Sequence, residues 1–162
     1  MKVFVSGKPK VGKTTLVLEL LDELRHKNVA GLIAPEIKDK KREGFFLQDI
    51  ASKEKVLMAS TKIRKNRVSK YGVDVKAIDR IVRKVSESVD KADIVVIDEI
   101  GKMEMKSKAF REFIDKVLNS EKNVIAVVHR NFVSLYKNKG IFFWLDRKNF
   151  EKIKEKILSL LR

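Results

Sequence analysis

Two glycines, a lysine and two threonines stand close together near the start of the chain. In the stretch SGKPKVGKTT (6–15), four residues separate Gly7 from Gly12, and Lys13 and Thr14 follow directly. This spacing is that of a phosphate-binding loop. Glycines let a tight backbone turn point its N–H groups at an anion, and a helix behind the turn adds the positive end of its dipole. We therefore predict that this stretch holds the phosphates of a nucleotide.

The side chains of the loop have separate expected roles. Lys13 should reach the β- and γ-phosphates, and the Thr14 hydroxyl should bind Mg²⁺. The apolar run KVFV (2–5) precedes the loop, and apolar residues at helical spacing follow it in LVLELLDEL (16–24). The flanks thus predict a strand before the loop and a helix after it. The expected contacts with the phosphates come from Gly7, Lys8, Pro9, Lys10, Val11, Gly12, Lys13, Thr14 and Thr15.

A pair of carboxylates could complete the chemistry. The apolar run DIVVID (93–98) ends in Asp98, and Glu99 follows it. An acid at the tip of a strand near the loop can hold the Mg²⁺ shell, a role that suits Asp98. Hydrolysis also needs a group that orients or deprotonates the attacking water, a role that suits Glu99.

Two other polar features have two interpretations each, and a third has one. The segment STKIRKNRVSKY (60–71) could supply a cation for the γ-phosphate, or it could be a solvated basic loop. His129 follows an expected strand, so it could sense the γ-phosphate at the carboxyl edge of the sheet or be a plain surface histidine. The charged residues of 36–44 predict a surface turn.

The composition limits the class of protein. The 162 residues suit a single domain over 1–162, and 37 basic against 22 acidic side chains give a formal charge of +15. Such a charge attracts polyanions, so a weak contact with nucleic acid through the basic surface is expected. The absence of cysteine excludes disulfides, thiol catalysis and thiolate metal sites. No apolar run approaches the ~20 residues that span a bilayer, and we expect a cytoplasmic monomer.

Strands and helices should alternate along the chain. Apolar runs predict strands over 2–5, 30–34, 45–50, 55–59, 93–98, 123–128 and 141–145. Apolar spacing predicts helices over 75–89, 110–118 and 150–160, with Asp74, Ser107 and Asn149 as possible N-caps. This order favours an α/β three-layer sandwich with a mostly parallel sheet and helices on both faces. The pair 45–50 and 55–59 should be a small hairpin insertion.

The order of the motifs along the chain also predicts the order of strands in the sheet. The strand expected over 30–34 intervenes in the chain between the two motif strands. We therefore expect that the motif strands are not neighbours in the sheet. This is the arrangement of the additional-strand, catalytic-glutamate class of P-loop NTPases.

Four segments resemble the thermophilic nucleoside-triphosphatase family, which has an animal relative known as the cancer-related nucleoside-triphosphatase. They are GKPKVGKTTL, PEIKDKKREGF (35–45), RVSKYGVDV (67–75) and VVIDEIGKMEM (95–105), and DEIGKMEM is the most distinctive run. The resemblance implies Mg²⁺-dependent hydrolysis of ATP, GTP, CTP and UTP. It also implies that Arg67 matches a family arginine, with a catalytic role beside Lys13 and Glu99. By position, the second part of the nucleotide site would be Ile94, Val95, Val96, Ile97, Asp98, Glu99, Ile100 and Gly101.

Three residues depart from the family pattern. Lys10 and Ser69 stand where the family usually has glycine. Phe150 stands where an arginine is expected near the last helix, although Arg147 could substitute for it. None of these three departures changes Lys13 or the carboxylates. We therefore expect them to affect the rate and the nucleotide preference, and not the class of protein.

Other functions fit parts of the same sequence. A small P-loop nucleotide or metabolite kinase would use the same loop, but it needs an acceptor motif, and none is visible. A nucleotide switch for cofactor assembly would explain Lys8, whereas Pro9 and Lys10 replace the glycines that such loops carry. A nucleic-acid-binding module would use the charge, but no stacking motif or recognition helix is evident.

Overall fold

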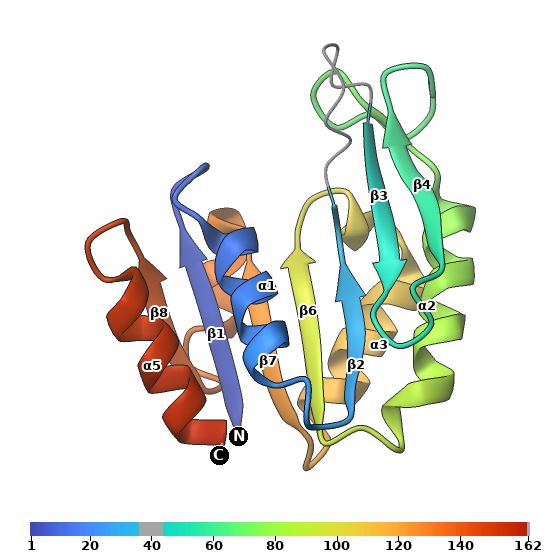
Figure 1. Ribbon diagram of the computed structural model, residues 1–162. Coiled ribbons are helices and arrows are strands. Elements are labelled where there is room, and N and C mark those ends of the chain that lie inside the picture. The colour runs from blue at the N-terminus through green and yellow to red at the C-terminus, as the bar shows by residue number, and fades with distance from the viewer. Residues whose placement is uncertain (36–43, 162) are drawn as a thin grey trace.

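The computed structural model describes residues 1–35 and 44–161, and in them one mixed sheet of eight strands has the order β5-β4-β3-β2-β6-β7-β1-β8 (Figure 1). Its five parallel strands carry the two motifs. They are β1 (Lys2–Gly7), β2 (Val29–Ile33), β6 (Ile94–Ile100), β7 (Asn123–Val128) and β8 (Ile141–Leu145). The α/β class and the mostly parallel sheet are as predicted.

The two motif strands, β1 and β6, lie on either side of β7. Val127 of β7 pairs with Val5 of β1 and with Asp98 of β6. The prediction that the motif strands are not neighbours is confirmed. The strand that separates them, however, is β7 and not the strand over 29–33, which pairs with the other side of β6.

The sheet continues beyond β2 with antiparallel strands. β3 (Gly44–Asp49) and β4 (Lys55–Ser60) form the predicted hairpin, and β3 pairs with β2. The two-residue strand β5 (Gly72–Val73), which the sequence did not indicate, pairs with β4 at the edge. The hairpin therefore widens the sheet on the side of the acidic strand.

Helices cover both faces of the sheet, as predicted (Figure 1). α1 (Lys13–Glu23) and α5 (Phe150–Leu161) pack on one face, and α2 (Val75–Val89) and α3 (Lys108–Leu118) pack on the other. Three short helical turns complete the described elements: η1 (Glu104–Lys106), η2 (Arg130–Phe132) and α4 (Val133–Tyr136). None of the described helices has the length and apolar character needed to cross a membrane.

Side-chain alternation along the strands gives each face its own core. In β1, Val3 and Val5 pack towards α1 and α5, whereas Phe4 packs towards the opposite helices. The main helices that pack on the Phe4 side start at caps that the sequence predicts. Asp74 accepts a bond from the Ala77 N–H at 3.0 Å, and Ser107 accepts one from the Phe110 N–H at 3.0 Å.

The third expected cap has another role. The Asn149 side chain donates to the Trp144 carbonyl at 2.9 Å and accepts from the Asp146 N–H at 2.8 Å. Both bonds lie within the turn that leads from β8 to α5. Asn149 therefore shapes this turn with its side chain, and its backbone carbonyl accepts the Ile153 N–H at 2.9 Å at the start of α5.

Candidate active site

The phosphate-binding loop joins the carboxyl end of β1 to the first turn of α1. α1 starts at Lys13 directly after Gly12, whose φ of 105° favours glycine. A Cβ on Gly7 would lie 2.6 Å from the Leu145 carbonyl oxygen, so β8 approaches the loop too closely for any side chain there. Both motif glycines are thus required by the backbone.

Two departures from the family pattern lie at positions that favour glycine. Lys10 has a φ of 64° and Ser69 has a φ of 56°, both in the left-handed region. The third departure, Phe150, packs its ring beside the loop, because a Cβ on Gly12 would lie 3.6 Å from it. The chain therefore keeps the backbone shape that glycine usually provides, with some strain.

Lys13 bends back over the loop. Its Nζ donates to the carbonyl oxygen of Gly7 at 2.7 Å and to that of Lys8 at 3.3 Å. Burial lowers the pKa of Lys13, and the nearby carboxylates of Glu99 and Asp98 raise it again. The ammonium thus lies between the loop backbone and the acidic strand, which is the place for a phosphate chain.

Asp98 and Glu99 lie near the carboxyl end of β6, in a distorted part of the strand. The pairing with β7 shifts register between Asp98 and Ile100, and such an irregularity redirects side chains. Asp98 is 4% exposed, and its Oδ2 is a buried oxygen without a hydrogen-bond partner in the described residues. Burial, and then the neighbouring Glu99, raise the pKa of Asp98 to about 7, against a hydrogen bond from Thr14 and the charge of Lys13.

Glu99 lies half-buried beside a second acid, Glu104, which the sequence analysis did not single out. A Cβ on Gly101 would lie 2.9 Å from Oε1 of Glu99 and 3.2 Å from Oε1 of Glu104, so the two carboxyls approach the same backbone atom. Burial raises the pKa of Glu99, and the charge of Lys13 lowers it. Glu99 is therefore a stronger base than a free glutamate.

Glu104 is almost completely buried at the start of η1, with 3% of its surface exposed. Burial, and then the charge of Glu99, raise its pKa to about 8, although backbone N–H groups bond to its carboxyl. Only one sequence signal pointed to it: an acid between two methionines, directly behind the acidic motif.

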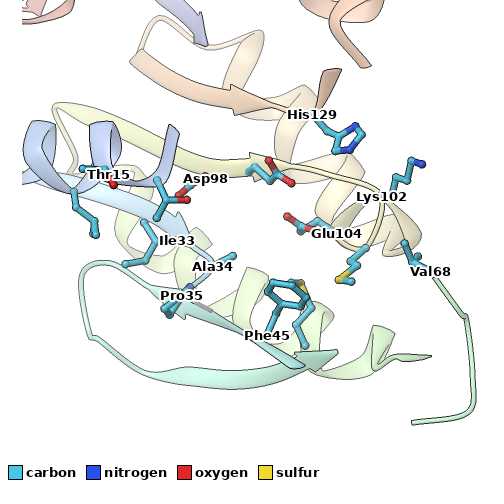
Figure 2. A pocket seen from close by; sticks show the side chains of 15 residues that line it. Thr15, Ile33, Ala34, Pro35, Phe45, Val68, Asp98, Lys102, Glu104 and His129 are labelled. Atoms are coloured by element: carbon cyan, nitrogen blue, oxygen red, sulfur yellow. The ribbon is translucent and has the colours of Figure 1, made fainter. Parts of the chain in front are cut away.

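These groups face one cavity of about 580 Å³ (Figure 2). Thr14 and Thr15 contribute from α1, and Asp98 and Glu99 contribute from β6. Glu104 and His129 also line it, so five expected site residues and one unexpected acid meet there.

His129 lies at the edge of the cavity, after β7. Its Nδ1 accepts a bond from the Asn131 N–H at 3.1 Å, which fixes the ring at the start of η2. Burial lowers the pKa of His129, as do the charges of Lys102, Lys13 and Arg130. A neutral, oriented imidazole at this place fits the sensor interpretation better than a free surface histidine.

Other expected site residues lie apart from the cavity. Ile94, Val95, Val96, Ile97 and Ile100 are buried with their side chains in the two cores, so any contribution of these side chains to the site is through packing. Lys8, Pro9 and Lys10 are exposed at the tip of the loop. Arg67 is exposed in the segment between β4 and β5, next to Val68, which does line the cavity. Most of the expected surface turn at 36–44 lies outside the described residues.

The position of β7 between the loop strand and the acidic strand, with a glutamate following the buried aspartate, defines a P-loop NTPase of the catalytic-glutamate type. A model of the family described as NTPase matches residues 2–158. The chain belongs to this family, and it is a nucleoside-triphosphatase.

Relatives support the same assignment over nearly the whole chain. Nucleoside-triphosphatase THEP1 of Methanocaldococcus jannaschii is 39% identical over 163 residues, which cover 98% of this chain and 96% of the relative. The protein of the same name from Pyrococcus abyssi is also 39% identical, with 100% and 93% covered. The crystal structure of THEP1 from Aquifex aeolicus superposes with a TM-score of 0.79 at 31% identity, covering 100% and 99%.

Proposed function

We propose that the chain hydrolyses nucleoside 5'-triphosphates to the diphosphate and phosphate with Mg²⁺, and that it discriminates little between bases. The observation that carries the proposal is the unpartnered Oδ2 of the buried Asp98, which lies opposite the phosphate-binding loop and beside Glu99. A buried carboxylate oxygen without a partner costs stability unless a cation joins it.

The residues present fit a magnesium ion. Thr14 and Asp98 are in hydrogen-bond contact, and together they offer a hydroxyl and a carboxylate on one side of the cavity. The described residues contain no group of three His, Cys, Asp or Glu side chains that could hold a metal alone. Mg²⁺ typically needs only one or two protein ligands when phosphates and water supply the others. When bound, the ion would neutralise charge on the phosphate oxygens.

Individual residues of the chain would then have separate roles in the reaction. Lys13 and the loop N–H groups would hold the β- and γ-phosphates and stabilise the charge that develops on them. Glu99 would orient the attacking water and accept its proton, and the raised pKa of this carboxyl makes it a stronger base than a free glutamate. His129 would contact the γ-phosphate from the β7 side.

The low specificity that we expect for the nucleotide base follows from the part of the ligand that the site binds. The loop, and the acids through Mg²⁺, would bind the phosphates, which all nucleotides share. The sequence has no Asn-Lys-x-Asp motif for guanine. We expect the kcat/KM values for ATP, GTP, CTP and UTP to lie within about tenfold, or ~1.4 kcal/mol. A preference of a thousandfold for one base, measured by phosphate release, would contradict this.

The two carboxylates provide the decisive test. In Glu99→Gln, Mg²⁺ and nucleotide should bind with near wild-type affinity, while turnover falls by ~10²–10⁴ because the general base is lost. In Asp98→Asn, the affinity for Mg²⁺ should fall together with the rate. Glu87→Gln, which changes an exposed carboxyl on α2, is the matched control. Normal hydrolysis by Glu99→Gln would refute catalysis by this glutamate.

The surface charge supports two minor proposals. A formal charge of +15 should attract single-stranded nucleic acid weakly and in a salt-dependent way, without base preference. Titration of a fluorescent oligonucleotide at low and high salt tests this. We also propose a monomer, which sedimentation equilibrium would check.

A further inference from the structure

The cavity that contains the carboxylates has a second, apolar half. It extends from Glu99 across the carboxyl end of β2 to the hairpin β3–β4 and to η1 (Figure 2). Met58 is buried, and the other apolar side chains are half-buried, so they present part of their surface to the cavity. The apolar half is lined by Ala34, Pro35, Phe45, Met58, Val68 and Met103.

The roles proposed for the phosphate-binding loop and Glu99 put this half on the side from which the γ-phosphate would be attacked. In phosphoryl transfer, the attacking and leaving oxygens are roughly in line with the phosphorus. The phosphate-binding loop holds the leaving side. Among the described residues that line the cavity, Thr14 lies in α1 directly after the loop. The lining extends from there to Glu99 and beyond it. The apolar half therefore adjoins the position of the nucleophile.

A water molecule needs far less room than this cavity offers. A water occupies about 30 Å³ of liquid volume, whereas the whole cavity, with its carboxylate side included, measures about 580 Å³. That volume lies in the range of pockets for small organic ligands, ~300–1,000 Å³, which are mostly apolar with a few placed polar groups. The size and lining thus suit a nucleophile that carries an organic body.

We propose that the apolar half binds a nucleoside as a second substrate, so that the chain transfers the γ-phosphate to a nucleoside hydroxyl as well as to water. This rests on the proposed hydrolytic site. The base would lie against Phe45 and the thioether of Met103, since sulfur and aromatic groups pack favourably on flat rings. Lys102, at the edge of the cavity, is placed to contact the polar part of the ligand.

The step balances without another reactant. The nucleoside hydroxyl oxygen forms a bond to the γ-phosphorus while the bond from the γ-phosphorus to the β–γ bridging oxygen breaks. The hydroxyl proton passes to Glu99 and then to solvent. The nucleoside diphosphate leaves with the former bridging oxygen as a terminal oxygen of its β-phosphate. The products are a nucleoside monophosphate and the diphosphate.

The experiment uses the full chain with Mg²⁺ and ATP labelled at the γ-phosphate. Individual nucleosides form one arm of the experiment, and benzyl alcohol, a ring-bearing alcohol without ribose, forms the other. Chromatography separates labelled phosphate from labelled ester, and the ratio of ester to phosphate is the readout. We expect ester with at least one nucleoside, and a much lower ratio with benzyl alcohol.

Two variants locate the acceptor. Ala34→Phe places a ring inside the apolar half, and we expect the ratio of ester to phosphate to fall at least tenfold. Leu57→Phe is the matched control, because Leu57 is 40% exposed on the same strand as Met58 and does not line the cavity. Its ratio should equal that of the wild type.

The outcomes separate the two proposals. Normal phosphate release with no ester from any acceptor, and no change in release when a nucleoside is added, would overturn the acceptor site and leave hydrolysis intact. Equal ester from benzyl alcohol and nucleosides would overturn the nucleoside assignment, as would an unchanged ratio in Ala34→Phe. No phosphate release without acceptor would contradict the hydrolytic function itself.

Discussion

Glu104 allows a sharp test of the electrostatics of the site. Its carboxyl is buried, and its pKa rises from 4.5 to about 8 on folding. Between these two values the folded chain holds a proton that the unfolded chain releases. Its contribution to stability is therefore fully present below about pH 4.5 and is lost progressively as pH rises to about 8.

The variant Glu104→Gln removes this dependence and keeps the size and the acceptor oxygen of the side chain. One pKa unit corresponds to about 1.36 kcal/mol. Between about pH 5 and pH 9, the free energy of unfolding of the wild type should fall by about 4 kcal/mol relative to the variant. Groups far from the site titrate alike in both proteins, so the difference reports Glu104 together with its coupling to Glu99 and Asp98.

Guanidinium unfolding of both proteins, without nucleotide and with a chelator, measures this difference across the pH range. Glu87→Gln serves as the control, because its carboxyl is exposed on α2, and its stability should parallel that of the wild type. A relative change below about 1 kcal/mol, or a wild type that gains stability at high pH, would refute the assignment of Glu104 as a buried acid.

Four further predictions concern the loop and the backbone. Lys13→Ala should lower turnover by at least ~10², since it removes a charge that meets the transition state; phosphate release measures this. Arg67→Ala should slow turnover more than it weakens nucleotide binding, which steady-state kinetics and equilibrium titration distinguish. Ser69→Gly should raise stability by about 1 kcal/mol in denaturant unfolding, because it relieves a φ of 56°. Gly31→Ala should prevent stable folding, seen as lost circular dichroism or insoluble protein, because its Cβ would lie 1.8 Å from the Val96 carbonyl oxygen.

Local signals predicted the elements well. The strands over 123–128 and 141–145 have the predicted bounds, because each apolar run ends at polar residues on both sides. The acidic strand continues two residues further than predicted, to Ile100, since the backbone stays extended through Asp98 and Glu99. β5 was missed because two residues carry no periodicity.

Long-range arrangement was harder to predict. Nothing local in 123–128 indicates that this strand, and not 29–33, separates the two motifs, because strand order depends on pairings between distant segments. The cavity is likewise assembled from α1, the end of β2, the hairpin and η1. Glu104 looked like one charged residue among many, and only its burial reveals it.

The place of β7 has a consequence for how the chain is made. Among the described strands, β1 and β6 do not pair with each other, because β7 (Asn123–Val128) lies between them and pairs with both. A nascent chain that has emerged as far as Leu118 carries both nucleotide motifs but lacks the strand that aligns them. A domain generally folds as a unit, and pairings between distant segments cost loop-closure entropy before they form. The unfinished chain therefore has no aligned pocket in which to capture a nucleotide until most of its length has been synthesised.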